Sequence, residues 1–246
     1  MMVDISAKSD VERYAEGFAI ADVKNVGACL AYGPRSVKAA YRYIPLLHPL
    51  PLFASATCGN DLVEVKAWTT WKTGVEMDAL FGALVGSIAA GATDIRKLGV
   101  AVKVKGVGLR LEEGPAPPAK VERPDLGYII RSSGYIHLTS TEPIKSGALE
   151  KGDPICAAKI TAPLNAKRLC EILPIDCVKL EYANSRIEVG SDYVFMEVVL
   201  KGRDASPSLE ALFATGTALL AIWDMVKKYE KDEKGQYPNT YIELGL

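Results

Sequence analysis

Apolar and polar residues follow two different periods along this chain, and each period predicts a different element. Strict alternation is typical of a strand with one buried face, whereas long Ala- and Leu-rich runs with few Gly or Pro residues are typical of a helix. Alternation predicts strands over 61–71 and 186–201. Helical patterns cover 35–42, 77–90, 163–173 and 209–229. Strands and helices therefore interleave, which favours an α+β fold.

Three short motifs occur in the same order in both halves of the chain. Residues 38–48 resemble 167–177, residues 78–81 resemble 210–213, and residues 94–97 resemble 224–227. In the first pair, the spacing from Lys38 to Pro45 and His48 equals that from Lys167 to Pro174 and Cys177. Because all three pairs lie at nearly the same offset, we expect an internal duplication.

A Pro-rich segment separates the two halves. Residues 113–119 read Glu-Gly-Pro-Ala-Pro-Pro-Ala, a composition that prefers extended polyproline geometry and interrupts helices and sheets. The predicted organisation is a first copy over 1–113, a linker over 114–127 and a second copy over 128–246. We expect each copy to form a ferredoxin-like sandwich of an antiparallel sheet and helices, and the two copies to form an intramolecular pseudo-dimer.

Composition narrows the classes of function. The chain has 246 residues, 49% of them hydrophobic, and a formal net charge of −1, which is ordinary for a globular protein and argues against a nucleic-acid surface. The sequence lacks a run of about 18 apolar residues, so no membrane span is expected. The polar N-terminus lacks the apolar core of a secretory signal, so a cytoplasmic location is expected.

Cysteine and histidine usage suggests no metal centre. The five cysteines are odd in number and none forms a Cys-x-x-Cys pair, which predicts small buried side chains in a reducing compartment. With two histidines in the chain, no zinc signature can be written.

Four polar features are candidates for chemistry, and each has a structural alternative. His48 lies in a Pro-rich apolar stretch and is either a general acid/base or a histidine satisfied within the core. Glu76 and Asp78 begin a predicted helix and either complement its dipole or shape a polar pocket. Asp224 and Lys227 share a helix face, as a surface ion pair or as part of a site. Lys151, before a predicted strand, is either a solvated turn residue or a cation aimed at phosphate.

Taken in order, these segments resemble one known family. Residues 3–8 are similar to its N-terminal signature, 44–52 to its Leu-Ile-Pro-Leu-Cys-His-Pro-Leu segment, and 73–80 to its Thr-Gly-Val-Glu-Met-Glu-Ala-Leu segment. In the second half, 151–153, 166–168 and 223–227 resemble its Lys-Gly-Asp, Ala-Lys-Arg and Tyr-Asp-Met-Cys-Lys segments. The family is cyclic pyranopterin monophosphate synthase (MoaC) of molybdenum-cofactor biosynthesis, and the resemblance spans nearly the whole chain as two copies.

The resemblance implies a reaction and a set of roles. The family rearranges 3′,8-cyclo-7,8-dihydro-GTP into a pyranopterin, closes a cyclic phosphate and expels diphosphate. It implies that Asp224 is the acid/base group and that Lys151, Lys167 and Lys227, with Arg168, bind phosphate or substrate charge. It implies that the pterin side is lined by His48, Leu46, Leu47, Glu76, Met77 and Asp78, and that Asp4 of the N-terminal signature also binds substrate. No cofactor is required, although a divalent cation can accompany the triphosphate.

Each half departs from the family pattern where the other keeps it. The second half has Asp176-Cys177 in place of Cys-His and Glu210 in place of a carboxylate pair, while the first half lacks Lys-Gly-Asp. Family sites lie between two protomers, so this chain is expected to hold one composite site and one degenerate site. A trimer of fused pseudo-dimers is the expected homo-oligomer. Two alternatives stay open: a different GTP-derived pterin reaction, and an inactive protein that binds a nucleotide or a partner.

Overall fold

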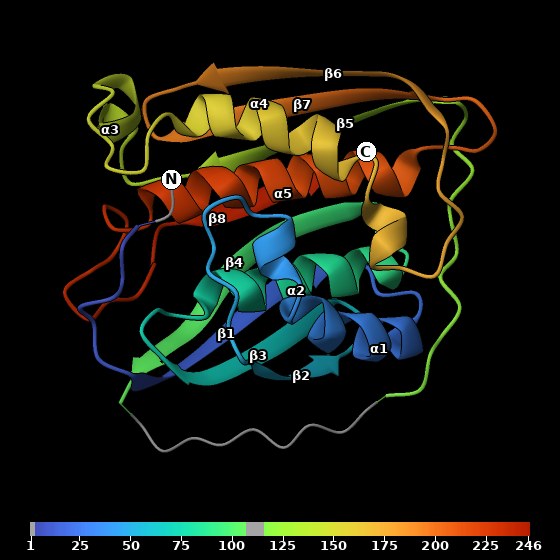
Figure 1. Cartoon of the computed structure of the whole chain (residues 1–246). Coiled ribbons are helices and arrows are strands. Elements are labelled where there is room, and N and C mark those ends of the chain that lie inside the picture. The colour runs from blue at the N-terminus through green and yellow to red at the C-terminus, as the bar shows by residue number, and fades with distance from the viewer. Residues whose placement is uncertain (1–2, 107–115) are drawn as a thin grey trace.

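The computed structural model describes residues 3–106 and 116–246, which build one curved antiparallel sheet around buried helices (Figure 1). In chain order the elements are β1 (Val11–Ala21), α1 (Val26–Val37), the 3-10 turn η1 (Ala40–Arg42), β2 (Phe53–Cys58), β3 (Leu62–Trp71), α2 (Glu76–Ala89), β4 (Asp94–Lys105), β5 (Ile129–His137), α3 (Glu142–Lys145), α4 (Pro154–Asn165), the 3-10 turn η2 (Leu169–Glu171), β6 (Leu180–Val189), β7 (Tyr193–Gly202), α5 (Ser208–Val226) and β8 (Tyr241–Gly245).

The sheet confirms the predicted α+β class. Its strand order is β2-β3-β1-β4-β8-β5-β7-β6, and every pair of neighbours is antiparallel. Read outward from the centre, each half has the strand order of a ferredoxin-like fold: β4-β1-β3-β2 on one side and β8-β5-β7-β6 on the other. The two sides join where Ile95 pairs with Leu244 and Leu98 with Ile242, so the sheet is continuous across the molecule.

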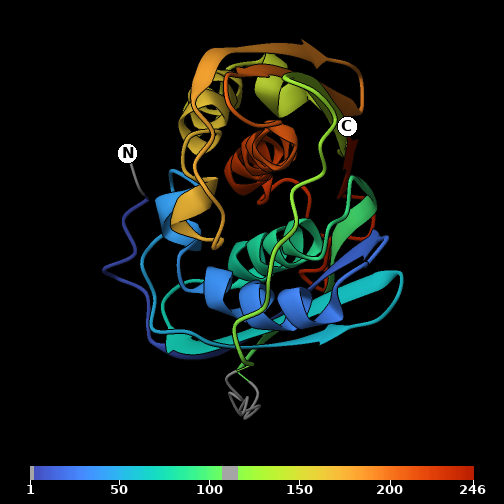
Figure 2. The ribbon, with the colours of Figure 1, turned by 90° about the vertical axis from the view of Figure 1, so that its right-hand side faces the viewer.

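Helices α2 and α5 form the centre of the core. Every residue of both helices is buried, which fits their apolar composition on all sides. Figure 2 shows them between the two wings of the sheet, with α1 and α4 beside them. By length and composition α5 is apolar enough to cross a membrane, but all of it is buried inside this protein, as expected of a core helix.

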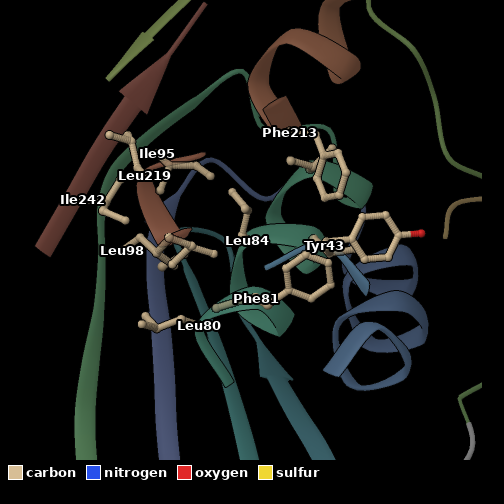
Figure 3. Close-up of a cluster of buried hydrophobic side chains, with 14 of the residues drawn as sticks. Tyr43, Leu80, Phe81, Leu84, Ile95, Leu98, Phe213, Leu219 and Ile242 are labelled. Carbon is tan, nitrogen blue, oxygen red and sulfur yellow. The ribbon is translucent and has the colours of Figure 1, made fainter. Parts of the chain in front are cut away.

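Aromatic side chains join the two halves between these helices. The ring of Tyr43 lies 5.4 Å from that of Phe81 and 5.6 Å from that of Phe213, and the two phenylalanine rings are 6.0 Å apart (Figure 3). Gly17 of β1 lets α2 approach the sheet, because a Cβ there would lie 2.6 Å from the backbone of Ala79. The first turn of α2 and the residue after the last turn of α5 meet at one end of the core, where Lys227 pairs with Glu76.

Two predicted helices have wrong boundaries because their caps were missed. The helix expected over 35–42 is α1, which begins much earlier, where the side chain of Asn25 accepts the amide of Ala28 at 2.9 Å. The helix expected over 163–173 is α4, which starts after Asp153 caps the amides of Ile155 and Cys156. The segment after Lys151 is therefore a helix rather than the expected strand.

Other elements show what alternation does and does not reveal. The strand over 61–71 and the helices over 77–90 and 209–229 are confirmed as β3, α2 and α5. The strand expected over 186–201 is a hairpin, because β6 and β7 are separated by a turn at 190–192. Residues 94–97 lie on β4, whereas 224–227 end α5, so this third pair of motifs has no common structure.

Two disulfides contradict the prediction that the cysteines are small buried side chains in a reducing compartment. Cys29 is bonded to Cys58, and Cys170 to Cys177, whereas Cys156 is free and exposed. The first bridge forms because α1 packs beside β2 and brings the two Cα atoms to 6.4 Å, a proximity that sequence spacing does not reveal. Of the predicted linker, residues 114–115 lie outside the described residues and 116–127 contain no helix or strand.

Candidate functional site

A buried cluster of charges forms where the start of α2 meets the end of α5. Asp224 lies in the last turn of α5, with its Oδ2 2.6 Å from Nζ of Lys151 and its Oδ1 3.0 Å from Nζ of Lys227. Nζ of Lys151 also donates to the backbone carbonyl of Asp224 at 2.7 Å. Nζ of Lys227 lies 3.6 Å from Oε1 of Glu76, the first residue of α2, so the ion pairs link the two halves of the chain.

Glu76 is held by further partners. Its Oε1 accepts hydrogen bonds from Nζ of Lys103 at 2.8 Å and from the hydroxyl of Tyr237 at 3.1 Å. Burial alone would raise the pKa of Glu76, but Lys227 and Lys103 outweigh it and hold the pKa well below its usual range. Glu76 is therefore a fixed anion that anchors Lys103 and Lys227.

The charges around Asp224 favour its ionised form. Burial acts to raise the pKa of Asp224, but Lys227 and Lys151 together lower it below its ordinary value. For Lys227 the order is reversed: burial acts to lower its pKa, and the carboxylates of Asp224 and Glu76 raise it. Burial lowers the pKa of Lys151 despite the carboxylate of Asp224, so Lys151 gives up a proton more readily than an ordinary lysine.

Asp78 has the opposite character. It is buried in the first turn of α2, and this burial raises its pKa well above the ordinary value even though Lys227 acts to lower it. Two carboxyl groups that face the same cavity, Asp78 and Asp224, thus differ in their affinity for a proton, as acid and base groups in active sites do.

A cavity of about 200 Å³ brings most of the predicted site residues together. The first half contributes Leu46, Leu47, His48, Leu50, Thr73, Gly74 and Asp78, and the second half contributes Glu150, Lys151, Asp224, Met225, Lys227, Lys228 and Lys231. The N-terminal segment closes one side, where Nε2 of His48 lies 3.1 Å from the carbonyl oxygen of Val3. The lining of this cavity thus combines the apolar side chains of Leu46, Leu47 and Leu50 with the charged Asp224 cluster.

A second cavity of about 550 Å³ adjoins the first and is strongly basic. It shares Lys8, Thr73, Gly74, Lys227 and Lys231 with the first cavity. Among the described residues its charged lining is Lys8, Arg13, Lys72, Lys103, Lys105, Lys227 and Lys231, with Glu76 as the one acid. Burial and the nearby charge of Lys103 lower the pKa of Lys231 to about 8. An anion with several charges would meet cations on several sides of this cavity.

Several of these cations were missed in the sequence. Lys103 and Lys105 are two residues apart on β4, so their side chains share one face of the sheet, and this spacing was the available signal. Lys231 lies beyond the end of α5, and only the return of the chain toward β4 brings it to the cavities.

Four of the predicted site residues line neither cavity. Lys167 is exposed, and Arg168 donates to the carbonyl of Arg42 and pairs with Glu171. Met77 is buried in the core, and Asp4 is exposed and accepts the amide of Ser6. A phosphate role for Lys167 and Arg168 and a substrate contact for Met77 and Asp4 therefore have no support from their positions. Within 3–106 and 116–246, no group of three or more His, Cys, Asp or Glu side chains is arranged to hold a metal ion.

Comparison with known proteins gives one consistent result. Residues 129–242 match the model of the MoaC family. A protein of Sulfolobus acidocaldarius named probable cyclic pyranopterin monophosphate synthase is 45% identical over 116 residues, which cover 45% of this chain and 80% of the relative. Proteins with the same name from Sulfurisphaera tokodaii and Archaeoglobus fulgidus are 44% and 36% identical, over 45% and 54% of this chain and over 76% and 89% of their own lengths.

Proposed function

The chain belongs to the MoaC family, and on this basis we propose that it converts 3′,8-cyclo-7,8-dihydro-GTP to cyclic pyranopterin monophosphate and diphosphate. We further propose that it does so at one composite site between its two halves. The observation that carries this proposal is that His48 and Asp78 of the first half line the same cavity as Lys151, Asp224 and Lys227 of the second half.

The shape and charge of the two cavities suit the two ends of this substrate. The first cavity offers the apolar side chains of Leu46, Leu47 and Leu50 to a flat heterocycle, with polar groups of Asp78 and His48 at its edge. The adjoining basic cavity suits the triphosphate, because charge-assisted hydrogen bonds from lysine and arginine are strong and their charges offset those of the leaving diphosphate. A substrate that spans both cavities would pass the Asp224 cluster.

The ionisation of the cluster suggests roles for its members. Asp224 is an anion at neutral pH and is placed to accept a proton, with Lys227 holding its carboxylate in position. Lys151, whose pKa is lowered, is placed to return a proton. Burial raises the pKa of Asp78 well above its ordinary value, so Asp78 holds a proton more tightly than an ordinary aspartate and, when protonated, can donate a hydrogen bond to a ring nitrogen or oxygen of the heterocycle.

The duplication and the assembly are part of the proposal. The recurring strand order and the matching turns η1 and η2 support two fused copies, with boundaries at 1–113, 114–127 and 128–246 as in the prediction. A trimer of such chains would be measured by light scattering as about three times 26.5 kDa. A cytoplasmic location stays part of the proposal, and its two disulfides would then require a setting such as that of hyperthermophilic archaea, whose intracellular proteins are rich in them.

The direct test is an anaerobic assay with the cyclic dihydro-GTP that a radical enzyme makes from GTP. We expect cyclic pyranopterin monophosphate and diphosphate in equal amounts. The same assay with EDTA added tests the divalent cation, because turnover falls with EDTA if a divalent cation accompanies the triphosphate. A folded chain that binds the substrate without turnover would favour the inactive binding protein, and a different pterin product would favour a related reaction.

A further inference from the structure

Arg123 is inserted between elements at the end of the core opposite to the candidate site. The segment 116–127 runs along that end, while the N-terminal segment and the chain after α5 lie at the other (Figure 1). The guanidinium of Arg123 donates through both terminal nitrogens to the carboxylate of Glu210, and also to the carbonyls of Ser206 and Asp176, each at 3.0 Å. Its side chain is 16% exposed and that of Glu210 is 3% exposed.

The partners of Arg123 occupy positions equivalent to residues of the first cavity. Glu210 is the third residue of α5, as Asp78 is the third residue of α2. Ser206 lies two residues before α5, as Gly74 lies two before α2. Asp176 and Leu47 each lie five residues after their 3-10 turn, η2 and η1. Asp78, Gly74 and Leu47 all line the first cavity, so Arg123 binds the equivalent wall of a second cleft.

Within 3–106 and 116–246, no equivalent of His48 or of the Asp224 cluster lines this second cleft. Cys177 lies at the position equivalent to His48 and is bonded to Cys170. The last turn of α2 and the residues after it are Ala89, Ala90 and Gly91, where α5 ends in the charged Asp224 cluster. The space that remains, about 380 Å³, is lined on one side by Glu122, Arg123 and Pro124 themselves.

Further hydrogen bonds hold the segment in place. The carbonyl of Ala119 accepts from the hydroxyl of Tyr32 at 2.8 Å, that of Lys120 from the side-chain amide of Asn25 at 2.9 Å, and that of Pro124 from the hydroxyl of Ser208 at 2.8 Å. These donors come from α1, its cap and α5, so the segment is fastened to both halves on either side of Arg123.

A guanidinium and the 2-amino-pyrimidinone edge of a guanine-like ring present the same pattern of hydrogen-bond donors. Both offer adjacent N–H donors in one plane, and a carboxylate accepts two such donors side by side. In the second cleft this arrangement is filled by the protein itself, with both carboxylate oxygens of Glu210 used by Arg123.

We propose that Arg123 closes the second cleft by occupying the place of a ligand's guanidine-like edge, so that each chain presents one cleft to substrate. The identity of that substrate rests on the proposed function, but the closure by Arg123 does not. Among the described residues, the lack of equivalents of His48 and of the Asp224 cluster in the second cleft is then matched by the physical loss of its binding surface.

Chemical rescue tests the closure. Arg123→Ala leaves Glu210 buried without its partner, and we expect the midpoint of thermal unfolding to fall by roughly 10 °C. Methylguanidinium chloride at millimolar concentration should restore part of this loss, because the cation fits the vacated carboxylate and carbonyls. Tetramethylammonium chloride at the same ionic strength should not. The matched control is Arg131→Ala, which removes an exposed arginine paired with Glu197 on the sheet surface and should change the midpoint by about 2 °C or less without any rescue.

A titration of the wild-type protein tests the same proposal without any substitution. Calorimetry with GTP as the probe should give one binding site per chain. Two equivalent sites per chain, or an Arg123→Ala protein that methylguanidinium does not stabilise selectively, would overturn the closure. If GTP does not bind at all while the rescue succeeds, the proposed function is weakened and the role of Arg123 stands.

Discussion

Replacing Asp224 with asparagine keeps the size of a buried side chain and removes its charge. In the wild-type protein this carboxylate lies 2.6 Å from Nζ of Lys151 and 3.0 Å from Nζ of Lys227, with 1% of its side chain exposed. The amide cannot accept a proton at neutral pH, and its two N–H donors face cations. We therefore expect both the reaction and the fold to respond to this change.

The structure sets the size of each response. Loss of one acid/base group lowers a rate by about 10²- to 10⁴-fold, and we expect kcat of Asp224→Asn to fall within that range. Removing one partner of a buried ion pair costs about 3 to 5 kcal/mol. In the variant Lys227 still has Glu76 at 3.6 Å, so Lys151 is the cation that is left without a carboxylate partner. The loss of stability should therefore be near the lower value, about 3 kcal/mol. For a chain of this size that corresponds to a fall of about 6 to 12 °C in the unfolding midpoint.

The stability difference should depend on pH with a definite sign. The folded protein holds the pKa of Asp224 below its ordinary value, because Lys227 and Lys151 outweigh burial. Its contribution to stability is therefore fully present above the ordinary carboxyl range and is lost as pH falls through the folded-state pKa. Wild-type and Asp224→Asn proteins should differ at pH 7, the difference should begin to shrink as pH falls to about 4, and it should vanish only below the depressed folded-state pKa of Asp224.

The assay follows diphosphate release at a temperature well below the midpoint of the variant, with folding checked by circular dichroism. Asp94→Asn is the matched control, because Asp94 occupies the motif that resembles the Asp224 motif but lies exposed on β4. It should retain activity within about two-fold, as surface changes usually alter stability by no more than about 0.5 kcal/mol. A folded Asp224→Asn protein with near-normal turnover would refute the assigned role.

Three further predictions concern charge, packing and covalent links. Lys231 loses its proton near pH 8, so kcat/KM should decline as pH rises from 7 to 9.5 in the wild type, and a Lys231→Gln protein whose pH profile shows the same decline would contradict this origin. Phe213→Ala should lower the free energy of unfolding in urea by about 3 to 5 kcal/mol, against less than about 1 kcal/mol for the half-exposed Phe53→Ala. Removing the disulfide that closes the 29-residue loop between Cys29 and Cys58, in a double Ala variant, should lower the free energy of unfolding by about 3.5 kcal/mol. A thiol titration that finds five reactive thiols in the denatured, unreduced wild type would show that the disulfides are absent.

The elements that were predicted well are those whose signal is local. Alternation located β3, and long apolar runs located α2 and α5, because these patterns reflect burial of one strand face or of a whole helix. The starts of α1 and α4 were missed because a single polar side chain, Asn25 or Asp153, decides where a helix begins. Alternation also continues through a hairpin turn, so the pattern alone predicts one strand where the structure has β6 and β7.

The candidate site was predictable in part. His48, Asp78, Lys151, Asp224 and Lys227 stood out because each lies in a short motif that resembles the family, and the structure places them around one cavity. The same reasoning also predicted Lys167 and Arg168, which follow α4 and line neither of the two cavities, so their role stays a prediction. A motif conveys which residues are present, whereas the path of the backbone decides which of them meet.

The amino-acid sequence by itself determined the fold class, the family and the repeated order of the motifs, because these depend on local periodicity and on short spacings along the chain. Only the tertiary structure decided that the first turn of α2 meets the last turn of α5, that Lys103, Lys105 and Lys231 form a basic cavity beside them, and that Arg123 fills the equivalent cleft at the far end. Each of these depends on contacts between residues far apart in sequence, and the free energy of such contacts exists only once the sheet has closed around its two central helices.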